Sequence, residues 1–381
     1  MPGYQSVCER ESAWLLNLVK ELVACESPSV DREALEQCAG ILSARFATAG
    51  ASVRRLPARS TADHVLAEWP GDGPAVLLLG HFDTVWPVGQ LSRMPIREEQ
   101  GRLFGPGVFD MKAGLALGLL AVRALHTAPP DRMCPRVRFL ATSDEEVGSG
   151  TSRSAVEQLA RESAAVLVLE PSLPGGALKT ARKGVGEFEL LVHGVPAHAG
   201  VDPDAGASAV HELARQIAAI EALADRARGL SINVGVVSGG SRSNVVAEHA
   251  RAVIDVRVAR LEDAAAVTSA FERLRPVNPR VRLEVRGGIN RPPMERTAGV
   301  ARLYALACNA ARDMGIELSE GATGGGSDGN FTAALGVPTL DGLGAVGDGP
   351  HALHEHIIIN ELARRAALVA GILARIGAWD N

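Results

Sequence analysis

The chain has 381 residues, of which 46% are hydrophobic and 22% charged, and its formal net charge at pH 7 is -5. This length is too great for one ordinary core, so we expect two domains or one domain with a large insertion. The composition is typical of a globular enzyme. An acidic balance without a basic block argues against a nucleic-acid partner, and no apolar run approaches the roughly 20 residues that span a membrane.

The N-terminal sequence and the cysteines indicate the compartment. The first residues lack a basic start followed by an apolar stretch, so we expect a cytoplasmic protein. The five cysteines are an odd number without a Cys-x-x-Cys pair. This pattern argues against a disulfide framework or a thiolate metal site, and predicts free, mostly buried thiols.

The first half of the chain alternates between strands and helices. Two helices come first, at 11–22 and 31–49, and Gly50 follows the second as a C′ residue. The later elements are strands at 52–56, 65–69, 75–79, 136–142 and 165–169, with helices at 111–125 and 151–161. Alternation of this kind predicts an α/β fold with a mostly parallel central sheet and helices on both faces.

The pattern of apolar and polar residues changes after Glu170. Period-two alternation over 184–193 predicts a strand with one wet face. It is followed by helices at 207–224 and 261–274 and by strands at 231–237, 252–259 and 281–285. We therefore expect an inserted α+β domain at 184–292, and one main domain formed by 1–183 and 293–381. The main domain resumes with a helix at 297–314, the glycine cluster at 324–329, a strand at 338–340 and a last helix.

Candidate catalytic side chains follow the strands, where ligands bind in open α/β sheets. The apolar run 75–80 ends in His81 and Asp83. These residues are two apart on an extended backbone, so their side chains point the same way and Asp83 can steady the histidine ring. A glycine-rich loop then delivers Asp110 to the start of the helix at 111–125, where it can cap the helix or ligate a metal.

More carboxylates follow two other strands. Glu145 and Glu146 come directly after the strand at 136–142, and Glu170 comes directly after the strand at 165–169. Adjacent glutamates cannot occupy one ligand position, so one can hold a metal while the other carries a proton. Each residue alone also has an ordinary explanation, as a hydrogen-bonded histidine, a helix cap or a solvated acid.

Together these residues form a nitrogen and oxygen ligand set without sulfur. It comprises His81, Asp110, Glu146, Glu170 and one of the C-terminal histidines. Such a set suits two borderline divalent ions, most often zinc, bridged by one carboxylate. Two ions about 3.5–4 Å apart can share a hydroxide and polarise a carbonyl, as amide hydrolysis requires.

Three motifs in the expected order give the chain a family resemblance. They are Gly-His-Phe-Asp-Thr-Val, Gly-Pro-Gly-Val-Phe-Asp-Met-Lys-Ala-Gly and Ser-Asp-Glu-Glu-Val-Gly. Over nearly its whole length the chain resembles the di-zinc peptidase family of glutamate carboxypeptidase, acetylornithine deacetylase and succinyl-diaminopimelate desuccinylase. The likeness is closest to the glutamate carboxypeptidase branch. It implies a zinc-peptidase catalytic domain and an inserted, ferredoxin-like dimerisation domain.

The resemblance also implies roles for the metal ligands. Asp110 would bridge two zinc ions, which cobalt or manganese could replace. His81 and Glu170 would bind one ion, and Glu146 and His351 the other. The family's histidine precedes a glutamate by four residues, as His351 precedes Glu355; His354 is the alternative.

The same likeness assigns the residues that act on water and substrate. Glu145 would be the general base, with Asp83 beside it in the catalytic group. His198 would reach into the active site of a partner subunit, which implies a homodimer; alone, it reads as a surface-loop residue. The implied substrate contacts are Asn244, Arg257, Gly326 and Arg291.

Arginine suits a substrate carboxylate because its fork makes two parallel charged hydrogen bonds. The alternative for Arg257 is an exposed strand residue in a salt bridge. At 180–184 the chain departs from the pattern of the glutamate carboxypeptidase branch, in which a lysine binds the side-chain carboxylate. Glutamate specificity therefore does not follow from the resemblance.

The expected protein is a cytoplasmic, homodimeric, zinc-dependent hydrolase without a nucleic-acid or membrane partner. It would cleave the amide bond between an acyl or peptidyl group and a free amino acid, with acyl-amino acids or short peptides as substrates. One alternative is an N-acyl amino acid deacylase or aminoacylase. Another is a non-catalytic, metal-stabilised binding protein, which would be expected to lose the base or a ligand; neither is lost here.

Overall fold

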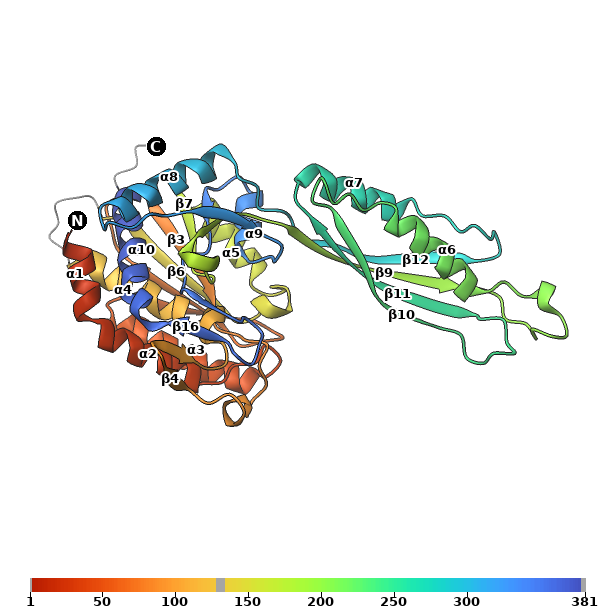
Figure 1. Ribbon diagram of the computed structural model, residues 1–381, viewed down its shortest axis with the longest axis horizontal. Helices are drawn as coiled ribbons and strands as arrows, with labels where there is room; N and C mark the ends of the chain where they lie inside the picture. The colour runs from red at the N-terminus through yellow and green to blue at the C-terminus, as the bar shows by residue number, and fades with distance from the viewer. Residues whose placement is uncertain (1, 128–133, 378–381) are drawn as a thin grey trace. The chain divides into compact units, whose positions relative to one another are not determined.

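The computed structural model describes residues 2–127 and 134–377, which form two compact units (Figure 1). The first unit comprises Met1–Ala181, Arg296–Ala322 and Ser327–Asn381, and the second comprises Arg182–Glu295 and Thr323–Gly326. The second unit thus includes a short segment that the predicted domain of 184–292 leaves out. The backbone N–H of Lys183 donates to the carbonyl of Thr323 at 3.0 Å, which ties this segment to the unit.

A six-stranded sheet forms the centre of the first unit. Its strands, in spatial order, are β1 (Ser52–Leu56), β2 (His64–Trp69), β6 (Arg136–Thr142), β3 (Ala75–His81), β7 (Ala165–Val168) and β14 (Thr339–Leu340). The last four strands pair in parallel, and β1 and β2 are antiparallel additions at one edge. The predicted mostly parallel sheet is confirmed. Parallel order brings the carboxyl ends of β6, β3 and β7 to one edge of the sheet.

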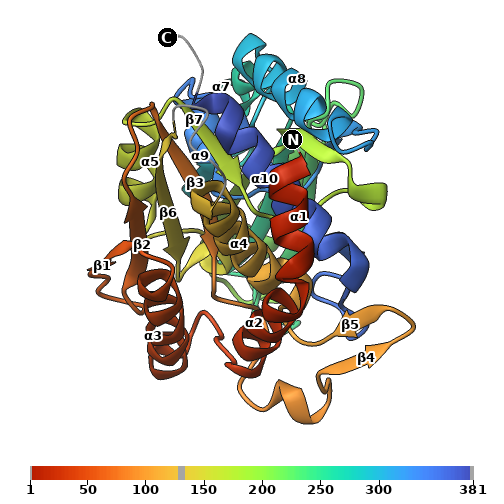
Figure 2. The same cartoon turned by 90° about the vertical axis from the view of Figure 1, so that its left-hand side faces the viewer.

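Helices cover both faces of this sheet because its strands alternate apolar side chains between the faces. On β3, Val76 and Leu78 join the large core, whereas Leu77 and Leu79 join a smaller one. The large core packs on α1 (Pro2–Arg10), α2 (Ser12–Ala24), α3 (Arg32–Thr48), α4 (Ala113–Thr127), α8 (Ala298–Arg312) and α10 (Leu362–Ile376) (Figure 2). The smaller core packs on α5 (Arg153–Arg161) and α9 (Gly329–Ala334).

Helix α4 begins two residues later than predicted. The segment Val108–Lys112 is an irregular turn in which Asp110 has an extended backbone (φ -115°, ψ 94°). The carboxylate of Asp110 therefore precedes the helix. Twelve of the fifteen residues of α4 are buried, and a Cβ on Gly114 would lie 2.1 Å from the carbonyl oxygen of Leu169. Glycine at this position permits the close approach of α4 to the chain that follows β7.

The first unit also contains short elements that the sequence did not predict, because brief polar strands carry little periodicity. A small sheet is formed by β15 (Gly347–Asp348), β16 (His356–Ile358), β5 (Arg102–Phe104) and β4 (Arg97–Glu99). A further pair is formed by β13 (Glu320–Thr323) and β8 (Leu178–Arg182). Short 3₁₀ segments of this unit lie at Gln90–Ser92, Glu145–Val147, Pro174–Gly176 and Ile359–Glu361, and a further one, Pro203–Ala205, lies in the second unit.

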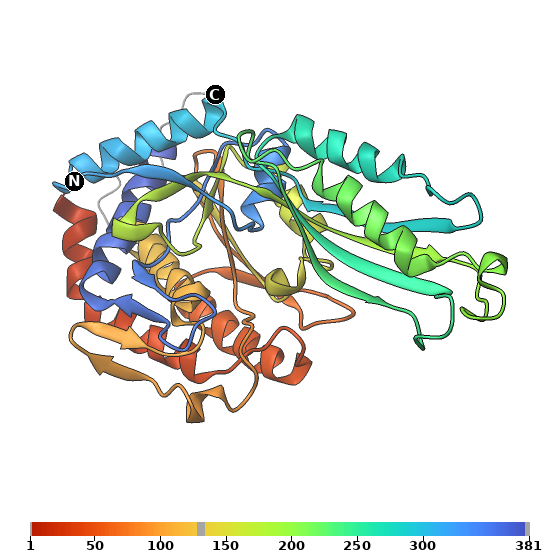
Figure 3. The same ribbon diagram turned by 45° about the vertical axis from the view of Figure 1, so that its right-hand side comes forward.

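The second unit is a four-stranded antiparallel sheet with two helices on one face (Figure 3). Its elements are β9 (Gly184–His193), α6 (Ala209–Glu221), β10 (Ser231–Gly239), β11 (His249–Val258), α7 (Leu261–Glu272) and β12 (Arg282–Arg291). The spatial order β10-β11-β9-β12 is the split βαβ arrangement of ferredoxin-like folds. Phe188 of β9 stacks on Phe271 of α7 with ring centroids 4.0 Å apart. The predicted α+β fold is confirmed, and its role in dimerisation stays a prediction.

Within residues 2–127 and 134–377, no helix is both long enough and apolar enough to cross a membrane. All five cysteines carry free thiols; Cys8 and Cys38 are buried, and the other three are half-buried.

Candidate metal centre and active site

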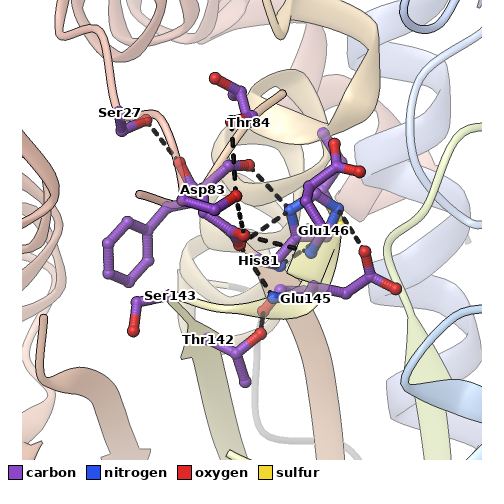
Figure 4. A network of polar contacts seen from close by, with 12 residues as sticks. Ser27, His81, Asp83, Thr84, Thr142, Ser143, Glu145 and Glu146 are labelled. Atoms are coloured by element: carbon purple, nitrogen blue, oxygen red, sulfur yellow. Dashed lines mark hydrogen bonds and ion pairs between the residues drawn. The ribbon is translucent and has the colours of Figure 1, made fainter. Parts of the chain in front are cut away.

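Five side chains of the predicted ligand set lie together in the first unit. His81 ends β3, Glu146 follows β6, and Glu170 follows β7, so three neighbouring strands present them at one edge of the sheet. Asp110 comes from the turn before α4, and His351 from the loop before β16. Figure 4 shows how His81, Glu145 and Glu146 converge, with Asp83 beside His81.

The carboxylate of Asp110 lies between two histidines. Its Oδ1 is 3.2 Å from Nε2 of His81, and its Oδ2 is 3.5 Å from Nε2 of His351. Glu170 Oε1 lies 3.4 Å from His81 Nε2, and Glu146 Oε1 lies 3.1 Å from His351 Nε2. Each imidazole therefore faces one oxygen of Asp110 and one further carboxylate. An imidazole nitrogen with carboxylate oxygens is a donor set that zinc accepts, and a shared carboxylate suits a pair of ions.

Asp83 orients His81 for this role. Nδ1 of His81 lies 3.0 Å from the backbone carbonyl oxygen of Asp83 and 3.4 Å from its Oδ1. Because both atoms are acceptors, the neutral ring carries its proton on Nδ1 and directs the Nε2 lone pair toward Asp110 and Glu170. This is the tautomer that a metal ligand requires.

The electrostatics of the cluster favour a bound cation. Burial lowers the pKa of His81, but contacts with Asp110, Asp83, Glu170 and Glu145 outweigh it and raise the pKa well above its usual value. The excess negative charge around one buried ring therefore draws in positive charge, which a metal ion can supply. Two overlapping groups have ligand atoms within 4.8 Å of one another: one is His81, Asp110 and Glu146, and the other is His81, Glu145 and Glu170.

The side chains of Glu145 and Glu146 have different neighbours, although both residues belong to one turn. Glu146 is paired with His351. Burial raises the pKa of Glu146, and the hydrogen bond that the His351 ring donates to the Glu146 carboxylate raises the pKa of His351 to about 9. Glu145 Oε2 lies 4.0 Å from His81 Nε2, beside the cluster. The backbone N–H groups of Glu145 and Glu146 donate to Asp83 Oδ1 and Oδ2 at 3.2 and 3.1 Å, so Asp83 fixes the turn as well as the histidine.

The alternative ligand His354 has a different environment from His351. Its ring lies against Gly349, where an added Cβ would be 2.8 Å from His354 Cδ2, and its carbonyl accepts a hydrogen bond from His356 Nδ1 at 2.9 Å. His351 is the histidine that contacts Asp110 and Glu146.

The structure shows that Glu355 also supports the metal centre. In the sequence, Glu355 served only to choose His351 over His354 as the ligand. This carboxylate is fully buried. Its Oε1 accepts the N–H groups of Phe109 and Asp110 at 2.9 and 3.0 Å, and its Oε2 accepts those of Gly107 and Trp86 Nε1, both at 2.9 Å. Burial raises the pKa of Glu355 to about 6, against the stabilising effect of these donors. Glu355 therefore holds the turn that presents Asp110.

A second group of polar residues supports the residues next to the turn of Glu145 and Glu146. The N–H of Ser143 donates to His64 Nδ1 at 3.2 Å, and His64 Nε2 lies 3.2 Å from Thr151 Oγ1. The Thr151 hydroxyl in turn donates to Asp144 Oδ2 at 2.7 Å. Burial lowers the pKa of His64, so its ring is neutral, accepts at Nδ1 and donates from Nε2. No sequence motif identified His64, because its neighbours come from distant segments.

The second unit brings together two predicted substrate-site residues. His198 Nδ1 accepts the N–H groups of Gly200 and Val201, both at 3.1 Å, so the neutral ring carries its proton on Nε2 as a donor. The carbonyl of Asn244 accepts the N–H of Ala199 at 3.0 Å. His198 and Asn244 are both exposed.

The remaining predicted residues of the second unit already have partners. Arg257 Nε donates to both oxygens of Asp255, at 3.1 and 3.0 Å, which is the ion pair expected as the alternative. The side chain of Arg291 packs on Gly326, where an added Cβ would lie 2.9 Å from Arg291 Cδ. Arg182, which was not predicted as a site residue, donates from Nη1 to the carbonyl of Gly326 at 3.0 Å. The substrate-binding roles of these residues stay predictions.

Comparison with known proteins identifies the family. Residues 77–375 match the model of peptidase family M20/M25/M40. The chain is 28% identical to carboxypeptidase G2 of Pseudomonas sp. (strain RS-16), over 98% of this chain and 92% of that protein. It is 30% identical to succinyl-diaminopimelate desuccinylase of Leptothrix cholodnii, over 90% and 93% of the two chains.

Solved structures share the fold. Aminopeptidase PepT of Bacillus cereus superposes with a TM-score of 0.77 at 23% identity, covering 96% of this chain and 98% of that one. The fold, the clustered histidines and carboxylates, and the family match over 77–375 agree: this chain belongs to peptidase family M20/M25/M40.

Proposed function

We propose that this protein is a zinc-dependent carboxypeptidase, which hydrolyses the amide bond between an acyl or peptidyl group and a free amino acid. The observation that carries the proposal is Asp110, whose two oxygens face His81 and His351. With Glu170 beside one histidine and Glu146 beside the other, the chain offers two metal positions that share one carboxylate. Its likeness to carboxypeptidase G2 supports the choice of reaction.

The chain's own residues account for proton transfer. Two zinc ions held by His81, Asp110, Glu146, Glu170 and His351 would polarise the scissile carbonyl and lower the pKa of water. Glu145, beside the ligand cluster, takes a proton from the attacking water as the water oxygen bonds to the carbonyl carbon. It then passes that proton to the nitrogen of the leaving amino acid as the C–N bond breaks. Asp83 holds Glu145 in place because its carboxylate accepts a hydrogen bond from the backbone N–H of Glu145.

The second unit would supply substrate recognition and dimerisation. His198 offers an Nε2–H donor from an exposed loop, suited to the oxyanion that develops on the scissile carbonyl. We place this donor in the active site of a partner subunit of a homodimer. Arg257 would exchange Asp255 for the free carboxylate of the substrate, with Asn244, Gly326 and Arg291 as further contacts. The second candidate reaction is deacylation of N-acyl amino acids, supported by the likeness to the desuccinylase.

The test is hydrolysis by zinc-loaded protein of N-acyl and peptidyl amino acids, each with a free or an amidated terminal carboxylate. We expect turnover of the free acids, and loss of ~10²–10⁴ in rate with full metal content in Glu145→Gln. Glu248→Gln, at an exposed position of the second unit, is the control and should keep full activity. Faster cleavage of small acyl groups than of peptides would favour the deacylase. Metal binding without turnover of any substrate would favour the binding protein.

A further inference from the structure

Arg365 is a buried cation on α10 (Figure 2). The residue is 4% exposed, and the other buried residues of this helix are apolar or glycine. Burial lowers the pKa of Arg365 to about 10, so the guanidinium still carries its charge at neutral pH. In the part of the chain that the structure describes, no carboxylate pairs with it. A buried charge is costly without such a partner, so the hydrogen bonds of Arg365 must compensate for its burial.

The guanidinium of Arg365 binds three backbone carbonyls, and each of them belongs to a glycine. Its Nε donates to Gly344 at 2.9 Å, its Nη1 to Gly176 at 2.8 Å, and its Nη2 to Gly342. Gly176 and Gly342 have φ values of 84° and 74°, which other residues adopt only with strain. Because the donors of a guanidinium are fixed in one plane, Arg365 holds the loop of Gly342 and Gly344 in a set position relative to the turn of Gly176.

The loop of Gly344 pairs with the chain that contains Glu170. The N–H of Gly344 donates to the carbonyl of Glu170 at 2.8 Å, and the N–H of Ser172 donates to the carbonyl of Ala345 at 3.0 Å. The approach is close, since a Cβ on Gly344 would lie 2.2 Å from the carbonyl oxygen of Leu169. Contacts with this loop therefore fix the backbone of Glu170.

The second segment that Arg365 binds follows Glu170 along the chain. The N–H of Gly176 donates to the carbonyl of Leu173 at 3.0 Å, and the N–H of Leu173 donates to the carbonyl of Ala177 at 2.9 Å. These hydrogen bonds close a turn shortly after Glu170. The loop beside Glu170 and the turn after it are thus both fastened to one guanidinium.

Glu170 belongs to only one of the two proposed metal positions. Its Oε1 lies 3.4 Å from Nε2 of His81. The other position is built from Glu146 and His351, whose side chains lie 3.1 Å apart. None of the three hydrogen bonds of Arg365 reaches the segments of these two residues. A change at Arg365 should therefore act on one metal position and spare the other.

We propose that Arg365 is a positioning residue for the zinc ion beside His81, which it serves by fixing the backbone of Glu170. The inference rests on the proposed function, since it needs two metal positions. Lysine cannot replace arginine in this role, because one ammonium nitrogen cannot reach three carbonyls that are spread around a planar fork. A purely structural arginine would differ, because its loss would lower the stability of the fold and affect both metal positions alike.

The experiment titrates zinc against a competing chelator in Arg365→Lys, with urea unfolding to establish that the variant is folded. We expect the binding of one ion to weaken about 10-fold or more, and the binding of the other to stay unchanged. Arg365→Gln, which buries no charge, repeats the test if the lysine variant does not fold. The matched control is Arg364→Lys, at the neighbouring exposed arginine, which is paired with Glu361 at 3.0 Å. This control should bind both ions as the wild type does.

Two further backgrounds identify the ion that is weakened. His351→Ala keeps the position beside His81 and Glu170, so adding Arg365→Lys should weaken the single remaining ion by the same factor. Glu170→Gln has already lost the carboxylate that Arg365 positions. The ion that Glu170→Gln protein retains should therefore bind with unchanged affinity when Arg365→Lys is added.

The outcomes separate this inference from the proposed function. Wild-type protein that binds no zinc, or only one ion, would contradict the proposed function and the role of Arg365 with it. Wild-type protein that binds two ions, together with an Arg365→Lys variant that binds both as tightly or both more weakly by the same factor, would overturn the positioning role alone. Weaker binding confined to the ion beside Glu146 would also overturn it.

Discussion

Replacing Glu355 with glutamine tests whether this buried carboxylate holds the turn of Asp110. The two oxygens of Glu355 accept four N–H donors, two each. Glutamine keeps one oxygen and places an NH₂ group where the other was. Two N–H donors then face another donor, and the two remaining hydrogen bonds lose their charged acceptor.

The expected loss in the free energy of unfolding follows from the hydrogen-bond donors around Glu355. A hydrogen bond to a charged group is worth about 1.5–3 kcal/mol, and a buried donor left without a partner costs about 1–3 kcal/mol. The amide should turn its NH₂ toward Trp86, which is half-buried and can reach water, leaving Gly107 N–H as the buried unpaired donor. We expect Glu355→Gln to lower the free energy of unfolding by about 3 kcal/mol. Because Glu355 orients a proposed ligand, zinc affinity should also fall about 10–100-fold.

The assay combines urea unfolding of the metal-free protein, hydrogen exchange read by mass spectrometry, and zinc titration. Exchange should accelerate in the peptide that contains Gly107 and Asp110. The control is Glu212→Gln, at a fully buried carboxylate of the second unit that accepts the N–H groups of Val277 and Asn278. The Glu212→Gln variant should lose stability in the second unit and keep its zinc affinity. A loss below about 1 kcal/mol in Glu355→Gln, with unchanged zinc affinity, would refute the positioning role.

Three further predictions concern the substrate, the subunits and pH. Arg257→Ala should raise KM by an amount equivalent to about 2–5 kcal/mol and remove the preference for a free over an amidated carboxylate; an undiminished preference would exclude this role. Inactive His198→Ala and Glu145→Ala subunits should regain activity when mixed, since one site of the heterodimer is then intact; heterodimers without activity would disprove action in trans. Burial lowers the pKa of His64 in the folded protein below its ordinary value of 6.5. As pH falls below 6.5, the unfolded chain therefore binds a proton at His64 before the folded protein does. The free energy of unfolding falls by up to about 1.4 kcal/mol per pH unit, until the pKa of the folded state is reached. His64→Gln should lack this slope in urea unfolding between pH 6.5 and 4.5, and an identical slope would refute the assignment.

Local sequence patterns were sufficient to predict the central sheet and the ends of its strands. The run 75–80 is apolar on both faces and ends in a polar pair, so its burial and the place of His81 follow from neighbouring residues. The start of α4 did not follow in this way. Its apolar pattern continues through Met111, but the extended backbone of Asp110 delays the helix to Ala113.

Residues that support the site depend on contacts between distant segments. Glu355 is 245 residues from Asp110, and a buried carboxylate has the same sequence signature as a solvated one. Sequence periodicity predicts which face of a helix is apolar, but it does not predict which polar group of a distant loop will bond to another.

The most direct test of the bridged metal centre is the zinc content of the dialysed protein, measured by mass spectrometry of the metal. We expect two ions per chain in the wild type, and the loss of both in Asp110→Asn, because Asp110 contributes an oxygen to each position. His351→Ala should retain the ion beside His81 and Glu170 and lose the other. Wild-type protein with a single ion, or Asp110→Asn protein that keeps two, would contradict a pair of metal positions bridged by Asp110.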